Sequence, residues 1–197
     1  TLATAVVGTA KSTTSYYLYR SLLPFDTSSI PDSAVITSAA LKLYVSSKTN
    51  QDNDGDDFIT LVQSTQASAT TLALADYART GATNNPTEGI DSTERKDISS
   101  VTTSAWLTFT LNSTGQGFVS KTGSTLLALR EGHDVIDSSF TSASTTASQY
   151  DQIVFRTSEY TGTTYDPVLT VTYTTTATTP AAAVTLQDLS YTYDAVG

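Results

Sequence analysis

The stretch VITSAALKLYV, residues 35–45, decides the fold class of this chain. Its apolar side chains fall mostly on odd positions, at Ala39, Leu41, Leu43 and Val45. Lys42 and Tyr44 occupy the positions between them. Successive side chains of a β-strand point to opposite faces, so this alternation predicts a strand with one buried face.

Similar segments recur along the chain, separated by residues typical of turns. We expect further strands at residues 16–25, 58–62, 106–111, 125–130, 152–157 and 168–173. A short helical turn is expected within residues 66–80, and a short helix capped by Asn112 follows residues 106–111. The 39 Thr and 25 Ser residues give a composition that favours strands over helices. We therefore predict an all-β fold, a jelly-roll-like antiparallel β-sandwich.

The length of 197 residues suits a single domain. We assign residues 1–174 to the sandwich, residues 175–183 to a Thr/Ala/Pro linker and residues 184–197 to an extra terminal strand. A lone strand has unpaired edges that need a partner, and residues 2–7 form a second candidate of this kind. Because the chain has no initiator Met, we expect it to be a processed or excised segment.

Charge and composition exclude several functions. Ten Lys and Arg residues stand against nineteen Asp and Glu residues, which gives a net charge of −9. Without a basic stripe, nucleic-acid binding is not expected. No apolar run approaches the roughly 20 residues that span a bilayer, so membrane insertion is not expected either. The chain has no cysteine, which excludes disulfides, thiolate metal sites and thiol nucleophiles.

The acidic loop DNDGDD, residues 52–57, is the best candidate for a metal site. Calcium takes six to eight oxygen ligands, and this loop offers four carboxylates within six residues: Asp52, Asp54, Asp56 and Asp57. The order of residues differs from an EF-hand, because Gln63 stands where the bidentate Glu would be. The alternative interpretation is a solvated hairpin tip whose Asp and Gly residues serve the turn.

Catalysis is not expected. His133 is the only histidine, and although Asp134 follows it, no nucleophile elbow accompanies the pair. Other acidic residues, such as Glu88 and Glu131, have no recognisable partner for acid–base chemistry. We interpret His133 as a structural residue in a loop after the strand that ends near Arg130.

Trp106 is the main candidate for ligand binding. It alternates with Leu107 and Phe109, so it points outward if these two are buried, and an outward indole can stack against a sugar ring. The alternative is that Trp106 covers the second face of the sheet under a loop. Tyr17 and Tyr19 are candidates with the same two interpretations.

Three stretches together are similar to a known family. They are RSLLPFDTSSIPDSAVITSAALKLY at residues 20–44, WLTFTLNSTG at 106–115 and FRTSEYTGTTYDPVLTVTY at 155–173. The chain from about residue 5 to 174 thereby resembles the DNRLRE-type (disaggregatase-related) β-sandwich domains. The end of the chain, YTYDAVG at 191–197, resembles the start of an Rhs/YD repeat. Arg20 and Glu159 lie within the matched motifs, and we predict an ion pair between them.

The resemblance implies a non-catalytic jelly-roll domain of secreted or cell-surface proteins of bacteria and archaea, some of which bind carbohydrate. We therefore expect an extracellular or cell-surface module that is adhesive or carbohydrate-binding. The alternative is a structural subunit of a filament or surface layer, assembled by strand exchange through the terminal segments. The expected partner is accordingly a polysaccharide or neighbouring copies of the chain, and the one expected cofactor is calcium.

Overall fold

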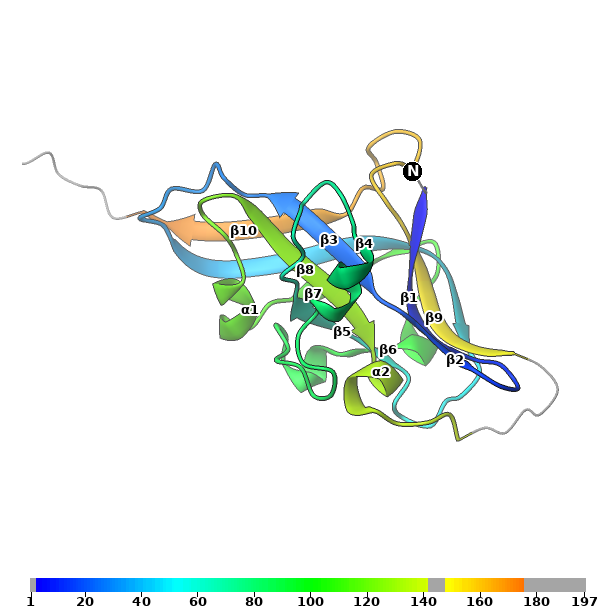
Figure 1. The fold of residues 1–197 in the computed structure, drawn as a ribbon. Coiled ribbons are helices and arrows are strands. Elements are labelled where there is room, and N and C mark those ends of the chain that lie inside the picture. Colours follow the sequence, from blue (N-terminus) through cyan, green and yellow to red (C-terminus); the bar gives the residue numbers. More distant parts are fainter. Residues whose placement is uncertain (1–2, 142–147, 176–197) are drawn as a thin grey trace, which may run out of the picture.

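The computed structural model describes residues 3–141 and 148–175. In this part of the chain two antiparallel β-sheets lie face to face, and the short helices are confined to connections (Figure 1). The predicted all-β sandwich is confirmed. The four-stranded sheet lies in front of the long strand of the six-stranded sheet in this view.

Each sheet combines strands from distant parts of the chain. The six-stranded sheet has the order β10 (Val168–Thr174), β4 (Val35–Asn50), β9 (Gln149–Arg156), β1 (Thr4–Lys11), β2 (Tyr16–Tyr19). Its sixth strand, β7 (Ala105–Thr110), also pairs with β4. The four-stranded sheet has the order β3 (Ser21–Asp26), β8 (Ser124–Glu131), β5 (Phe58–Gln63), β6 (Lys96–Asp97). The helices are α1 (Ser113–Gly117), α2 (Gly132–Ile136) and the 3-10 turns η1 (Leu74–Ala78), η2 (Ser92–Glu94) and η3 (Ile98–Ser100).

Strand β4 carries the core of the six-stranded sheet. Leu41, Leu43 and Val45 are fully buried, as the alternation predicts. They pack into one apolar cluster with side chains of the opposite sheet, such as Leu61 and Leu129. Each such side chain contributes about 1.5–3 kcal/mol by its burial. Asn112 caps α1 by accepting a hydrogen bond from the backbone N–H of Gly115, so the predicted short helix is confirmed as well.

Residues 16–25 do not form one strand. The chain breaks at Arg20, and the two halves, β2 and β3, belong to different sheets. The Arg20 side chain is 7% exposed and binds Asp134, which lies in α2. The run of apolar and aromatic residues continues through this crossing, although β2 is exposed at all four positions and β3 is partly buried. The predicted ion pair of Arg20 with Glu159 is wrong, because Arg20 pairs with Asp134 instead.

The N-terminal segment is not an unpaired strand. β1 pairs with β9 along its whole length and with β2 from Gly8 to Lys11, so it lies inside the sheet. The expectation of a lone strand at residues 2–7 was wrong for the described part of it, because residues 4–7 pair with residues 153–156 of β9. The predicted terminal strand at 184–197 lies outside the described residues.

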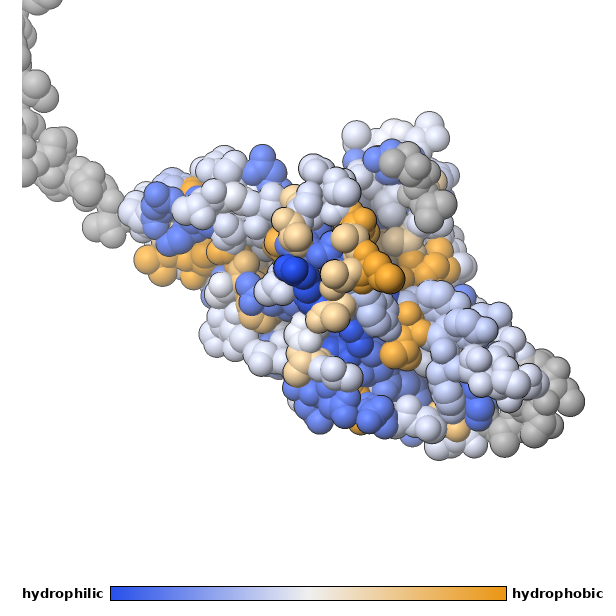
Figure 2. All heavy atoms as spheres, in the orientation of Figure 1, coloured by the Kyte–Doolittle hydropathy of each residue, from blue (hydrophilic) through white to orange (hydrophobic). Residues whose placement is uncertain are grey.

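The surface of the sandwich is mixed in character. Figure 2 shows hydrophobic residues in separate patches bordered by hydrophilic ones on the face in view. Scattered exposed apolar residues are normal for a folded domain. Among the described residues, no helix has the length and apolar character needed to cross a membrane.

Candidate functional site

A polar cluster lies at one end of the sandwich, where two segments meet. The loop of residues 51–57 connects β4 of one sheet to β5 of the other, and α2 follows directly after β8. The two segments approach closely at Gly132, where a Cβ atom would lie 1.8 Å from the carbonyl oxygen of Asp56. A glycine at this position therefore allows the acidic loop to reach α2.

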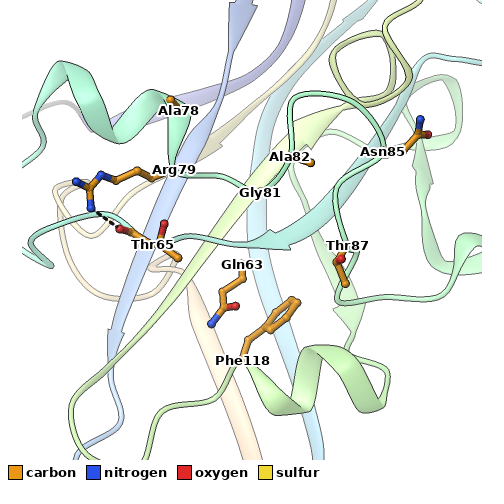
Figure 3. A pocket seen from close by; sticks show the side chains of 9 residues that line it. All are labelled: Gln63, Thr65, Ala78, Arg79, Gly81, Ala82, Asn85, Thr87 and Phe118. Atoms are coloured by element: carbon orange, nitrogen blue, oxygen red, sulfur yellow. Dashed lines mark hydrogen bonds between the residues drawn. The ribbon is translucent and has the colours of Figure 1, made fainter.

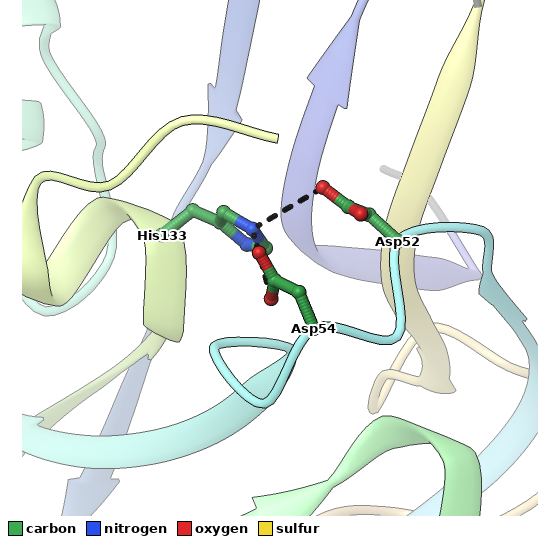
Figure 4. Close-up of side chains that lie close together, drawn as sticks. All are labelled: Asp52, Asp54 and His133. Carbon is green, nitrogen blue, oxygen red and sulfur yellow. Dashed lines mark ion pairs between the residues drawn. The ribbon is translucent and has the colours of Figure 1, made fainter. Parts of the chain in front are cut away.

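Asp52, Asp54 and His133 come together at this contact (Figure 4). His133 Nε2 lies 3.8 Å from Asp52 Oδ2 and 3.6 Å from Asp54 Oδ1. The three donor atoms all lie within 4.8 Å of one another. The side chains of Asp52 and His133 are buried, and that of Asp54 is 13% exposed. This group could hold a metal ion.

The other ring nitrogen of His133 is fixed by Glu131. His133 Nδ1 donates to Glu131 Oε1 over 2.8 Å, and Glu131 Oε2 accepts hydrogen bonds from the Thr9 hydroxyl and the backbone N–H of His133. Phe140 stacks on the imidazole with ring centroids 4.6 Å apart. The ring therefore has one orientation, with Nε2 directed at the acidic loop.

The cluster carries an excess of negative charge. Burial alone lowers the pKa of His133, but the hydrogen bond to Glu131 and the charges of Glu131, Asp54 and Asp151 outweigh it and raise the pKa to about 9. Burial raises the pKa of Glu131, and its hydrogen bonds to His133 and Thr9 offset only part of that effect. The pKa of Asp151 is also raised, first by burial.

The four predicted metal ligands separate into two pairs. Asp52 and Asp54 belong to the cluster. Asp57 instead accepts hydrogen bonds from the Asn50 side-chain amide and the backbone N–H of Gly55, so its carboxylate stabilises the loop itself. Asp56 is half-buried and does not join the group either.

The sequence reasoning missed His133 as a member of the metal-binding group. The signal available in the sequence is the spacing Glu131-x-His133 at the end of a strand, in which a carboxylate can orient the imidazole.

His133 and Asp134 do not form a dyad. Asp134 accepts hydrogen bonds from Arg20, with Nη2 to Oδ1 at 2.6 Å, and from Arg130, with Nε to Oδ2 at 2.7 Å. The Arg130 side chain is fully buried and also donates to carbonyl groups of residues 80, 82, 83 and 134. Burial opposes ionisation of Asp134, but the two arginines outweigh it and lower the pKa of the carboxyl group. This buried ion pair anchors α2.

A second candidate site lies on the outer face of the six-stranded sheet, and we name it the aromatic row: Trp106, Tyr44, Tyr165 and Tyr160. Trp106 pairs with Tyr44 across β7 and β4, and their ring centroids are 5.6 Å apart. Tyr165 lies 4.2 Å from Tyr44, and Tyr160 follows at 6.1 Å from Tyr165. Trp106 is 39% exposed, so its predicted outward direction is confirmed.

Two cations accompany the aromatic row. The Arg156 guanidinium lies 3.7 Å from the ring centroid of Tyr160 and 4.4 Å from that of Tyr165. Lys42 Nζ lies 5.2 Å from the Trp106 ring. In the described ranges neither cation forms an ion pair with a carboxylate, although the chain is strongly acidic.

Tyr17 and Tyr19 lie apart from this row. The register places them opposite Ala10 and Gly8 on the edge strand β2, and β1 and β9 separate that strand from β4. They are 50% and 38% exposed. The structure therefore does not bring the three predicted ligand-binding residues into one site.

A cavity of about 420 Å³ lies elsewhere, beside the end of β5 (Figure 3). Of the residues that line it, Arg79 alone is titratable, and its guanidinium donates to the carbonyl oxygen of Thr65 over 3.1 Å. The remaining lining consists of small, polar or apolar side chains, together with Phe118. This cavity offers no pair of groups for acid–base chemistry.

Comparison with known proteins gives no assignment: neither a family model, nor a curated protein, nor a solved structure matches this chain. The resemblance to DNRLRE-type domains and to an Rhs/YD repeat therefore stays a prediction from the sequence.

Proposed function

We propose that this chain is a non-catalytic, extracellular β-sandwich module that binds carbohydrate through the aromatic row. The observation that carries the proposal is the exposed indole of Trp106, which contacts the Tyr44 ring on the neighbouring strand, with Tyr165 and Tyr160 of the β9–β10 connection following in the same group of rings. Aromatic rings present an apolar face to the C–H groups of a sugar. The Tyr44 hydroxyl already donates to the carbonyl oxygen of Ser104, so we assign hydrogen bonding to the sugar to the hydroxyls of Tyr160 and Tyr165.

Arg156 and Lys42 supply the polar part of the proposed site. Both cations contact aromatic rings, and in the described part of the chain neither is neutralised by an acidic side chain. They can donate hydrogen bonds to hydroxyl or carboxylate oxygens of a bound glycan. A surface that combines rings with a few placed polar groups is typical of ligand-binding sites.

The cation at the acidic loop has a structural role in this proposal. The Asp52–Asp54–His133 group lies in the β4–β5 loop and α2 at one end of the sandwich, whereas the aromatic row includes Tyr44 and Trp106 on the outer face of one sheet. Calcium, the ion predicted from the loop, is one occupant to be tested there, and its expected effect is on stability and not on glycan binding.

Retention of the full chain on insoluble polysaccharides tests the proposal, with wild type compared to Trp106→Ala. We expect the substitution to weaken retention about tenfold or more, since loss of a stacked aromatic ring costs over 1 kcal/mol. Tyr173→Ala is the matched control, because Tyr173 is also 39% exposed but lies outside the aromatic row. Its retention should match that of wild type.

Equal retention of both variants, or no retention of wild type on any polysaccharide, contradicts the proposal. Light scattering on the same samples tests the alternative of a structural subunit. Long oligomers that disappear when residues 180–197 are deleted would favour that alternative over a binding module.

A further inference from the structure

The imidazole of His133 presents a buried nitrogen that nothing in the described structure satisfies. Nε2 has no hydrogen-bond partner, and the side chain is 1% exposed. Buried polar atoms are normally paired, so each exception needs a physical reason. Figure 4 shows this nitrogen directed at the carboxylates of Asp52 and Asp54.

The distances suit an ion between the three groups better than direct hydrogen bonds. An N–H···O bond joins atoms about 2.7–3.2 Å apart, and the two carboxylate oxygens lie at 3.6 and 3.8 Å from Nε2. Two ligand atoms that are each about 2.1 Å from a tetrahedral ion stand about 3.4 Å apart. The two distances from Nε2 are within a few tenths of an ångström of this value, and all three donor atoms lie within 4.8 Å of one another.

The surroundings of the imidazole are those of a metal ligand. Glu131 accepts the Nδ1 proton, which leaves Nε2 as the nitrogen that can bind a metal, and the Thr9 hydroxyl in turn orients Glu131. A carboxylate that holds the second nitrogen of a ligating histidine is a recurrent feature of zinc sites. Asp52 is held in the same way, by the backbone N–H and the hydroxyl of Thr141.

The donor atoms decide between classes of metal. Calcium and magnesium prefer a shell of oxygens, whereas imidazole nitrogen suits zinc and its first-row neighbours. The Asp57 carboxylate accepts hydrogen bonds from Asn50 and Gly55 within the loop. The four carboxylates of the loop therefore do not form the oxygen-rich shell that calcium needs. One nitrogen and two carboxylate oxygens remain, with further positions left for water.

We propose that Asp52, Asp54 and His133 bind a divalent ion of the zinc class, which fastens the loop between β4 and β5 to the end of β8. The ion joins the connection between the two sheets to the strand that carries Glu131, and Thr9 links the site to β1 of the opposite sheet. The site is separate from the aromatic row, so the proposed metal binding does not depend on the proposed carbohydrate binding.

Calorimetric titration of the metal-stripped full chain with Zn²⁺, and separately with Ca²⁺, tests this site. We expect one Zn²⁺ to bind per chain and to raise the melting temperature. His133→Gln should weaken Zn²⁺ binding about 100-fold or more, and Asp54→Asn about tenfold or more, because each removes a ligand. Asp56→Asn is the matched control from the same loop and should change affinity less than about threefold.

Co²⁺ provides a second measurement, because its visible absorption reports nitrogen and oxygen ligands directly. Asp54→Asn keeps the test decisive if His133→Gln does not fold, since the Asp54 side chain is 13% exposed. Loss of the Co²⁺ spectrum in Asp54→Asn but not in Asp56→Asn supports the proposal. Absence of 1:1 Zn²⁺ and Co²⁺ binding overturns it, and so does Ca²⁺ binding that His133→Gln leaves unchanged.

Discussion

The substitution Asp134→Asn should destabilise the protein strongly, because it removes the charge that two buried arginines share. Asp134 binds Arg20 through both carboxylate oxygens and Arg130 through one of them. The side chains of Arg20, Arg130 and Asp134 are 7%, 0% and 3% exposed. Asparagine keeps the shape of the side chain and one acceptor oxygen but leaves both guanidinium groups without a counter-ion.

The magnitude follows from this burial. Removal of one partner from a buried ion pair costs about 3–5 kcal/mol, because the remaining charge stays out of water. The carbonyl groups that accept hydrogen bonds from Arg130 offset part of the loss, so we expect about 3–4 kcal/mol. A domain of this kind has a free energy of unfolding of about 5–15 kcal/mol, so the variant remains folded but loses a large part of its stability.

Equilibrium unfolding in urea measures this change. With a slope near 2–3 kcal/mol per molar urea, the midpoint should fall by about 1–2 M. Asp137→Asn is the matched control, three residues along: Asp137 is exposed and has φ 58°, a conformation that asparagine tolerates well. Its midpoint should stay nearly constant. A loss below about 1 kcal/mol in Asp134→Asn would refute the reasoning, because the arginines would then not depend on this carboxylate.

Three further predictions concern acid stability and the packing around the cluster. Burial raises the pKa of Glu88, but hydrogen bonds from an arginine and a threonine outweigh it and lower the pKa in the folded state. Ionised Glu88 therefore adds to the free energy of unfolding at pH values above its unfolded pKa near 4.3, and this contribution is lost as the pH falls through its lower pKa in the folded state. Urea unfolding measured across that pH range should show a weaker pH dependence of stability in Glu88→Gln than in wild type. Gly132→Ala should cost about 1–3 kcal/mol and weaken Zn²⁺ binding, because the new Cβ would meet the carbonyl oxygen of Asp56 at 1.8 Å; unchanged values of both would contradict that close approach. Thr9→Val should cost about 1–3 kcal/mol in thermal or urea unfolding, since it removes one of the two hydrogen bonds that Oε2 of the buried Glu131 accepts, and a neutral effect would mean that water replaces the hydroxyl.

Alternation identified the strands because each sheet has one face in the core. β4 alternates from Ala39 to Val45, and the structure buries Ala39, Leu41, Leu43 and Val45. The same signal could not locate the crossing at Arg20, because the chain stays extended while it passes from one sheet to the other. Nor could it pair β1 with its neighbours, since the partner β9 lies more than 130 residues away in sequence.

The cluster was predictable only in part for the same reason. The loop contributes Asp52 and Asp54 at a spacing that the sequence displays, and the prediction of an acidic metal site there included both residues. His133 joins them through the pairing of β8 with β5, which is a property of the folded sheet. Its partner Glu131 stands at the end of a strand whose last five residues are buried. A charged residue at the end of a buried strand needs a polar partner, so such a residue in a sequence indicates that a second polar side chain lies close to it in the fold.

Charge balance around α2 favours an added cation. On one side, two arginines face the single carboxylate of Asp134, and this half is positive. On the other side, one imidazole faces four acidic side chains: Asp52, Asp54, Glu131 and Asp151. Even a protonated His133 leaves that half negative, and the raised pKa values of Glu131 and Asp151 reflect the cost of this charge and of burial. A divalent ion would reduce the charge, and at 100 times its dissociation constant it would stabilise the fold by about 2.7 kcal/mol.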